Sequence, residues 1–331
     1  MVNPSFVDPN VLLPYSQASG AFETLAGGEP LVRLSDGDLF VYIKRLDFRS
    51  QVAGGQSAYN NLPSISTTLS MISTPTYLMR ARGEYDHHDT AAMGRWGVSI
   101  VETQRLGMRQ AHFQLARSAL LYGLNPVNGE GLLNTNGATA ISLPSDTFGN
   151  STVVTYDNGQ MAFFILSQIS AMKSRTNQLG LGRKFTILGP QRVLGAFEYQ
   201  GIVQLTSYQR VGGGTTSTAG VVKDVAEMND DEITWVYDDT LIGKGAGGND
   251  AIVIVMPEVQ KPQGQKVNTN EMAKLGPGIE ACTLQYADMA APREIPTPLP
   301  GGAVDVLSEW RITSGWAVRP EAVTVVSAQY Q

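Results

Sequence analysis

One long helix is encoded in the middle of the sequence, and a glycine-rich turn follows it directly. Ser99-Ile-Val-Glu102 is a capping box, in which Ser99 and Glu102 each accept a hydrogen bond from the other's backbone N–H. Apolar residues recur at helical spacing as far as Tyr122, and Gly123 stands where a helix favours a glycine C-cap. Residues 99–122 would form a rod of roughly 36 Å, which sets the scale of the domain around it.

This helix carries two apolar stripes, which predict that it is covered on two sides. The main stripe consists of Val101, Met108, Ala111, Leu115, Ala119 and Tyr122, and the second of Leu106, Phe113, Ala116 and Leu120. Glu102, Arg105 and Arg109 occupy the remaining face. The segment Asn128-Gly-Glu-Gly-Leu-Leu-Asn134 comes shortly after the helix.

The other expected elements alternate without a regular rhythm, which is typical of an α+β protein. Further helices are expected at 89–96, at 158–178 between caps Asp157 and Gly180, and from Gly189-Pro190 to residue 199. Strands are expected at 39–48, 64–70, 75–82, 184–188, 232–237, 251–256 and, as two strands joined near Arg319-Pro320, within 310–326. The strand at 251–256 is apolar throughout, so we expect it to be buried on both faces.

Several segments have too little apolar sequence to form a core of their own. Residues 1–38 are punctuated by glycine and proline and indicate an arm that becomes ordered only against another surface. The ribbon expected within 39–82 mixes polar and apolar residues on both faces, so its stability should come from neighbours. Residues 206–220 indicate a glycine-rich loop, and 257–279 and 291–302 are rich in proline and glycine.

Composition narrows the function classes. Only 16% of the 331 residues are charged, against roughly 25% in an average soluble domain, so the polar surface is largely neutral and suits extensive protein contacts. The net charge of -6 argues against sequence-specific nucleic-acid binding but leaves open contact with a packaged polyanion through local basic patches. The single cysteine, Cys282, excludes an internal disulfide framework and is expected to be a small buried residue. We expect neither a secretory signal nor a membrane span.

Five motifs suggest chemistry, and each has a simpler structural explanation. Gly243-Lys-Gly-Ala-Gly-Gly248 matches a dinucleotide fingerprint, but a strand follows it rather than a helix, so we expect a hairpin turn. Asp86-His87-His88-Asp89 is the densest set of metal-ligand types. Adjacent histidines should diverge, so a solvated turn with Asp89 near a helix N-terminus is expected, with a metal at a subunit contact as the alternative.

The remaining three motifs also favour structural roles. His112 lies inside the long helix, where a hydrogen-bonded core or interface histidine is expected rather than a catalytic base. Asn150-Ser-Thr152 is a formal glycosylation sequon and is expected to be a surface loop. The carboxylates at 230–232 and 238–239 are expected to be solvated strand flanks, with an acid pair or a calcium site as the alternatives. No catalytic residue, cofactor-binding residue or metal ligand is therefore assigned.

Three stretches of the chain resemble the major capsid proteins of tailed bacteriophages: Leu62-Pro63, the helix at 99–122 and Gly129-Glu-Gly-Leu-Leu-Asn134. The strand, Gly-Pro and helix at 184–199 and the closing Trp316-Ala-Val-Arg-Pro-Glu-Ala-Val323 fit the same pattern, so the resemblance covers about residues 55–331. It implies the HK97-like shell fold, which encapsulins share. Capsomers of such proteins, hexamers and pentamers, would build an icosahedral shell around double-stranded DNA.

The resemblance implies a division of the chain into an N-terminal arm (1–38), an extended β-hairpin loop (39–88), a peripheral domain with the spine helix 99–122 (89–157), an axial domain (158–262) and a return to peripheral strands (263–331). Because no long, highly charged N-terminal segment is present, a separate scaffold protein is implied, together with a portal and, as a further candidate, a cement protein. DNA contact would be non-specific, and no membrane would be involved. The virion, assembled in the host bacterial cytoplasm, would be its location. An encapsulin-type compartment and a metal- or carboxylate-dependent soluble enzyme remain the alternatives.

Overall fold

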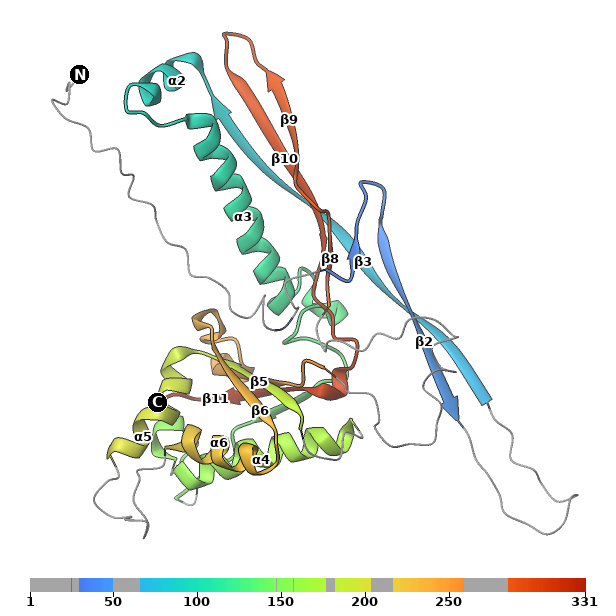
Figure 1. The fold of residues 1–331 in the computed structure, drawn as a ribbon, viewed down its shortest axis with the longest axis vertical. Helices are drawn as coiled ribbons and strands as arrows, with labels where there is room; N and C mark the ends of the chain where they lie inside the picture. Colours follow the sequence, from blue (N-terminus) through green and yellow to red (C-terminus); the bar gives the residue numbers. More distant parts are fainter. Residues whose placement is uncertain are drawn as a thin grey trace, which may run out of the picture.

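A long ribbon with a helix beside it forms the upper body of the molecule, and a second sheet with three helices forms the lower body (Figure 1). The computed structural model describes residues 25, 30–49, 66–146, 148–156, 158–176, 182–203, 217–258 and 285–331. Together the two bodies confirm the α+β class. The arm within 1–24, the caps Asp157 and Gly180, most of the loop at 206–220, the segment 259–284 and Cys282 lie outside the described residues.

The upper sheet is organised by one strand of 20 residues, β3 (Ser66–Tyr85). Its order is β1-β8-β10-β3-β2. β9 pairs with β10 along the edge opposite β3, next to the position of β8. These strands are β1 (Val32–Arg33), β2 (Phe40–Arg49), β8 (Ala287–Asp288), β9 (Arg293–Pro298) and β10 (Val304–Thr313). Residues 66–75 of β3 pair with β2, and residues 76–85 pair with β10. The sheet is thus two ribbons that share one continuous strand.

The prediction of two separate strands at 64–70 and 75–82 is therefore wrong for the described part of this segment. Residues 71–74 contain no glycine and pair with residues 41–44 of β2, so the ladder holds this stretch extended. Pro75 stands where the pairing partner changes, and a proline that cannot donate to a ladder is tolerated at such a boundary. β9 was also missed, because its prolines suggested a loop; it is an edge strand, where proline is allowed.

The spine helix α3 (Ile100–Tyr122) begins and ends as predicted, but its buried face differs. The Ser99 hydroxyl accepts a hydrogen bond from the Glu102 N–H at 3.4 Å. The buried residues are Met108, His112, Ala116, Ala119, Leu120 and Leu121, which face β3 and β10. Leu106, Phe113 and Leu115 are exposed, so the expectation of two covered sides, with Leu115 on the main buried stripe, is wrong within the subunit. The short helix α2 (His87–Gly94) precedes α3 and begins two residues earlier than expected.

The lower sheet has the order β4-β11-β7-β5-β6. Its strands are β4 (Thr139–Ser142), β5 (Lys184–Gly189), β6 (Glu232–Tyr237), β7 (Asp250–Val255) and β11 (Val323–Ala328), and its helices are α4 (Asn158–Arg175), α5 (Gln191–Val203) and α6 (Thr218–Met228). Helix α6 was missed, because the glycine-rich sequence before it hid the N-cap Ser217. Short 3-10 turns lie at Pro126–Asn128, Val153–Thr155, Asp239–Leu241, Ala246–Gly248 and Pro320–Ala322.

Strand β7 separates the two hydrophobic cores, which confirms that 251–256 is buried on both faces. Ile252 and Ile254 pack with α4, α5 and β5 in the lower core. Val253 and Val255 pack instead into the core that contains Leu120 of α3. The lower body is therefore joined to the end of the spine helix through a shared apolar core.

Candidate functional site: the helix–turn joint and an assembly face

The Gly-Leu-Leu-Asn turn folds back on the end of the spine helix. The backbone N–H groups of Leu132 and Leu133 donate to the carbonyls of Leu120 and Leu121, both at 3.1 Å. The Asn134 side-chain amide donates to the Tyr122 carbonyl at 2.9 Å. The last turn of a helix leaves its carbonyls without intrahelical partners, so this motif acts as a C-terminal cap made from a distant turn.

Two glycines allow this close approach. Gly123 and Gly131 have φ angles of 71° and 83°, in the region that favours glycine. A Cβ atom on Gly131 would lie 2.3 Å from the Gly123 nitrogen, and one on Gly123 would lie 2.4 Å from the Glu130 carbonyl oxygen. The Gly131 N–H also donates to the Gly315 carbonyl at 2.7 Å, so the turn is fixed to the segment after β10.

Glu130 is the buried charge of this joint, with an exposed fraction of 5%. Its carboxylate accepts hydrogen bonds from the Tyr77 hydroxyl at 2.8 and 3.0 Å, the Ser314 hydroxyl at 2.7 Å and the Asn125 N–H at 3.1 Å. Burial, followed by the bond to Glu130, raises the pKa of Tyr77 to about 12. The carboxylate thereby joins β3, the end of β10 and the turn after α3. The sequence offered one signal for it, a lone glutamate between two glycines.

A second polar cluster connects the spine helix to the lower body. Arg117 of α3 forms an ion pair with Asp238, which is 1% exposed. Asp238 also accepts hydrogen bonds from the N–H and hydroxyl of Thr240. The Tyr122 hydroxyl donates to the Thr240 carbonyl at 2.6 Å, and the Lys244 ammonium lies 5.3 Å from the Tyr122 ring centre. These contacts fix the angle between the two bodies.

The acidic clusters are divided among separate structural roles. Asp231 forms an ion pair with Lys173 at the end of α4, and Asp238 pairs with Arg117. Asp239 accepts a hydrogen bond from the Gln191 N–H at the start of α5, at 2.8 Å. Two of these carboxylates are buried with a cation instead of solvated, so the expectation of solvated strand flanks is wrong for Asp231 and Asp238.

The two adjacent histidines do not diverge. His87 and His88 open α2, and their rings lie side by side with centres 3.9 Å apart and planes tilted by 40°, which corrects the expected geometry. Asp86 is the N-cap, and it exchanges hydrogen bonds with Asp89 in a capping box. The hydrogen bond from the Asp89 N–H lowers the pKa of Asp86. Both histidines are exposed, and the two aspartates serve the helix end.

His112 is the hydrogen-bonded core histidine that was expected. Its Nε2 lies 3.1 Å from the Ser308 hydroxyl of β10, and the Trp310 ring stands edge-on at 5.8 Å. Burial lowers the pKa of His112. Within the described ranges, no group of three or more His, Cys, Asp or Glu side chains is placed to hold a metal ion. Likewise, none of the helices described is both long and apolar enough to cross a membrane.

Asn150 lies in a surface loop as expected, but the turn at 243–248 is not the expected hairpin turn, because it joins β6 to β7 and β5 lies between those strands in the sheet. Residues 243–248 form a turn that leads into β7, and the Gly245 N–H donates to the Asn249 carbonyl at 2.7 Å. Asn150 is exposed in a loop, where its side-chain amide donates to Asp146 at 3.3 Å.

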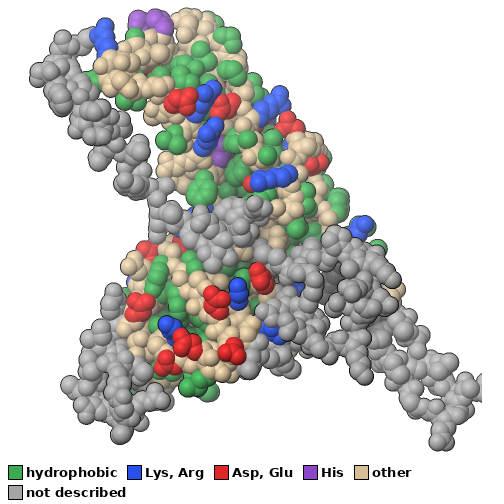
Figure 2. Space-filling model, viewed as in Figure 1, with side chains coloured by type: hydrophobic (Ala, Val, Ile, Leu, Met, Phe, Trp, Pro, Cys, Tyr) green, Lys and Arg blue, Asp and Glu red, His purple; other side chains and the backbone are tan. Residues whose placement is uncertain are grey.

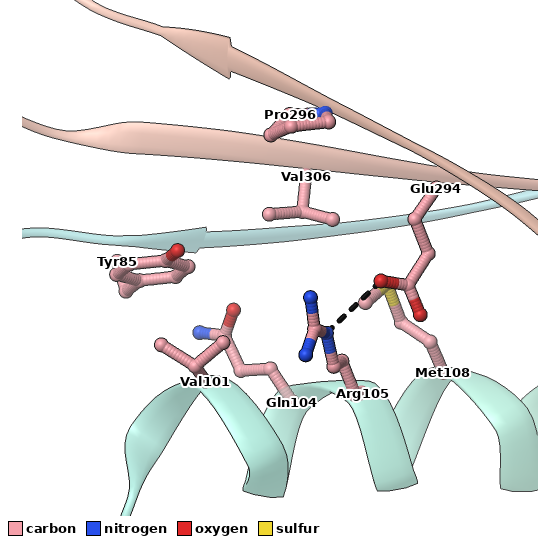
Figure 3. Close-up of a pocket in the computed structure, with 8 residues that line it drawn as sticks. All are labelled: Tyr85, Val101, Gln104, Arg105, Met108, Glu294, Pro296 and Val306. Carbon is pink, nitrogen blue, oxygen red and sulfur yellow. Dashed lines mark ion pairs between the residues drawn. The ribbon is translucent and has the colours of Figure 1, made fainter.

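A small cavity lies between the N-terminal half of α3 and the β3–β10 ribbon (Figure 3). Its volume is about 190 Å³, and Val101, Met108 and Val306 are among the apolar side chains that line it. The Arg105 guanidinium crosses the cavity and pairs with Glu294 of β9 at 2.9 Å. The ion pair between Arg105 and Glu294 therefore connects β9 to the spine helix across this cavity.

The β2–β3 hairpin has one covered face and one apolar face open to solvent. Val41 and Ile43 point into the core and are 7% and 8% exposed. The opposite face carries large side chains that are each at least half exposed: Phe40, Tyr42, Leu69 and Met71. An apolar strand face without cover is typical of a surface that binds protein. Elsewhere, on the face shown in Figure 2, acidic and basic side chains are interleaved rather than gathered into a field of one sign.

Solved structures with this arrangement are subunits of phage-type capsids. The chain in the capsid of Myoviridae phage XM1 matches 97% of this chain and 100% of its own length, with a TM-score of 0.65 and 10% identity. The capsid of an empty GTA particle matches over 98% of this chain and 95% of its own, at TM-score 0.56 and 12% identity. The capsid of the cyanophage P-SCSP1u matches over 99% and 93%, at TM-score 0.56 and 12% identity.

The chain has the HK97-like capsid fold. The fold implied by the resemblance is thereby confirmed over almost the whole length. No protein-family model matches the sequence, and no curated protein matches it either. At 10–12% identity the similarity lies in the path of the backbone.

Proposed function

We propose that this protein is the structural subunit of a phage capsid, assembling into hexamers and pentamers that form an icosahedral shell around double-stranded DNA. The observation that carries the proposal is the match of fold, from end to end of both chains, with subunits of phage-type capsids. Its location would be the virion, after assembly in the host bacterial cytoplasm.

The surface of the subunit supports the same proposal. A closed shell is built from many contacts that repeat under symmetry, so each subunit must present apolar surface that only a neighbour covers. The open face of the β2–β3 hairpin is such a surface. Leu106 and Leu115, which are exposed on α3, add a second one. The face of α3 that packs on β3 and β10 takes Met108 and Ala119 from one predicted stripe and Leu120 from the other, and assembly would cover apolar residues of both stripes that the subunit leaves exposed.

The division into arm (1–38), extended loop (39–88), peripheral domain (89–157 and 263–331) and axial domain (158–262) is part of this proposal. The hairpin of β2 with residues 66–75 would form the projecting part of the loop. A separate scaffold protein, a portal and a cement protein are proposed partners, and contact with DNA would be non-specific.

We propose no enzymatic role. The metal- or carboxylate-dependent enzyme is disfavoured because Asp231 and Asp238 are neutralised by Lys173 and Arg117, and because His112 bonds to Ser308. An encapsulin-type compartment is the alternative shell. The contents of purified particles distinguish the two shells: nuclease-protected DNA indicates a capsid, whereas a packaged protein cargo indicates a compartment.

Assembly of the purified protein tests the proposal. Wild-type protein should form capsomers or particles in the megadalton range by light scattering and negative stain. The double variant Leu69→Ser, Met71→Ser should remain an unassembled subunit or small oligomer. Both positions are exposed, so the free energy of unfolding of the subunit should change by no more than about 0.5 kcal/mol.

The control variant is Thr67→Ser, which lies on the same hairpin face but removes little apolar surface. It should assemble like the wild type. A wild-type protein that remained a small oligomer both alone and when co-expressed with its neighbouring structural genes would contradict the proposed function.

A further inference from the structure

We infer that Arg311 is a positioning residue that fixes the direction in which the β2–β3 hairpin projects from the upper sheet. The need for such a residue follows from the pairing of β3. Pro75 is paired with Phe40 of β2, and the next residue, Thr76, is paired with Thr313 of β10. Since no residue of β3 pairs with both neighbours, β3 is the one described strand that belongs to both ribbons, and the turn at 34–39 is the other chain connection between them (Figure 1).

Two side chains and a backbone carbonyl, from three segments, meet at the point where the partner changes. One nitrogen of Arg311, Nη1, donates to the Asp38 carbonyl at 3.1 Å and to the Thr76 hydroxyl at 3.0 Å. The Thr76 hydroxyl donates in turn to the same Asp38 carbonyl at 2.5 Å. The Thr76 N–H donates to the Leu39 carbonyl at 3.0 Å. We call Arg311, Thr76 and Asp38 the clasp.

The clasp links the start of the hairpin to the strand that the hairpin does not pair with. Asp38 belongs to the turn that leads into β2, whereas Arg311 lies on β10. The turn itself is held firmly, because the Asp38 carboxylate accepts hydrogen bonds from the Ser35 N–H at 2.7 Å and the Ser35 hydroxyl at 2.8 Å. Arg311 therefore donates to a turn that has hydrogen bonds of its own. A hydrogen bond from a charged donor is also stronger than one from a neutral donor.

Without the clasp, the hairpin would still be attached but its angle would be set less tightly. Val41 and Ile43 would keep its root in the core, while β3, the turn at 34–39 and the bond from the Thr76 N–H to the Leu39 carbonyl would carry the change of direction. The far end of the hairpin would then sweep a wider arc. In a shell subunit, the direction of the hairpin would determine which part of a neighbouring subunit its open apolar face contacts, a consequence that rests on the proposed function. The effect on the hairpin itself can be measured in the isolated subunit.

The test is a distance distribution between spin labels at Thr68 on the hairpin and Gln114 on α3, both exposed, with Cys282 replaced by serine. Arg311→Met keeps an unbranched side chain but removes the donor, and Thr76→Val removes the hydroxyl at nearly constant shape. Both should broaden the distribution about twofold or more. They should also speed amide exchange in residues 40–44 and 67–74 by about tenfold, as expected for losing a hydrogen bond to a charged group.

Two further variants make the result decisive. Arg80→Met removes an exposed ion pair with Glu309 of β10, away from the clasp, and should leave the distribution unchanged. Arg311→Lys keeps a charged donor and should restore part of the narrow distribution. If Arg311→Met does not fold, Thr76→Val decides alone. Unchanged distance distributions in the clasp variants, or equal broadening by Arg80→Met, would overturn the inference. If the clasp variants broaden the distribution as expected but the wild-type protein does not assemble, that result would count only against the proposed shell.

Discussion

The Tyr77 hydroxyl donates to both oxygens of the Glu130 carboxylate, at 2.8 and 3.0 Å, across a separation of 53 residues. Tyr77 lies on the part of β3 that pairs with β10, and Glu130 lies in the turn that caps the spine helix. The pair therefore ties the sheet of the upper body to the end of α3. Removing either partner leaves a buried polar group of the other without its bond, which costs more than the bond itself contributes.

Tyr77→Phe should lower the free energy of unfolding of the isolated subunit by about 1–3 kcal/mol at neutral pH, the cost of losing a hydrogen bond to a charged group. Its effect on pH dependence follows from the raised pKa. Unfolded tyrosine releases its proton near 10.0 and folded Tyr77 near about 12, so this contribution is present below pH 10.0 and is lost as the pH rises through about 12. Denaturant titrations across that window should show a shallower decline for Tyr77→Phe than for the wild type. Equal slopes would contradict the assignment.

Gly131→Ala should destabilise the subunit by more than about 3 kcal/mol or prevent folding. The added methyl group would lie 2.3 Å from the Gly123 nitrogen at a φ of 83°. Gly107→Ala is the matched control, because Gly107 lies inside α3 with no atom within 4 Å of an added Cβ. This control should stabilise the protein by about 0.5–1 kcal/mol through helix propensity. Thermal melts of both variants check the pair.

Two leucines on the spine helix should respond differently to truncation. Leu120 is 2% exposed in the subunit, so Leu120→Ala should cost about 2–5 kcal/mol. Leu115 is 37% exposed, so Leu115→Ala should cost less than about 1 kcal/mol in the unassembled state. Chemical denaturation of isolated subunits gives both values. A large loss for Leu115→Ala would mean that its face is covered within the subunit.

The double change His87→Ala, His88→Ala should leave subunit stability within about 0.5 kcal/mol and particle yield nearly unchanged, because both side chains are exposed on α2. Elemental analysis of particles before and after the change gives a second measurement. A bound metal that disappears with the histidines would revive the metal site at a subunit contact. A reduced yield without a metal would place the two histidine rings at an interface.

Local sequence determined the elements whose signals lie in adjacent residues. The capped spine helix, the strands β5, β6 and β7, and the turn before β7 follow from capping residues, β-forming runs and glycines that act within a few positions. The same signals fail where one pattern has two structural meanings. The prolines of β9 suggested a loop, because an edge strand cannot be recognised from sequence without the strand it pairs with. The glycine-rich sequence before α6 likewise obscured the serine that caps this helix.

Only the tertiary structure decided which surfaces meet. The two apolar stripes of α3 are alike in sequence, and β3 and β10 bury a face that takes residues from both, so Leu120 is buried whereas Leu106, on the same stripe, is exposed. Glu130 could not be matched with Tyr77 and Ser314, nor Arg117 with Asp238, because those pairs are brought together by sheet pairing over long separations. The course of β3 shows the same limit. Its residues favour an extended chain locally, while the change of partner at Pro75 depends on where β2 and β10 lie in space.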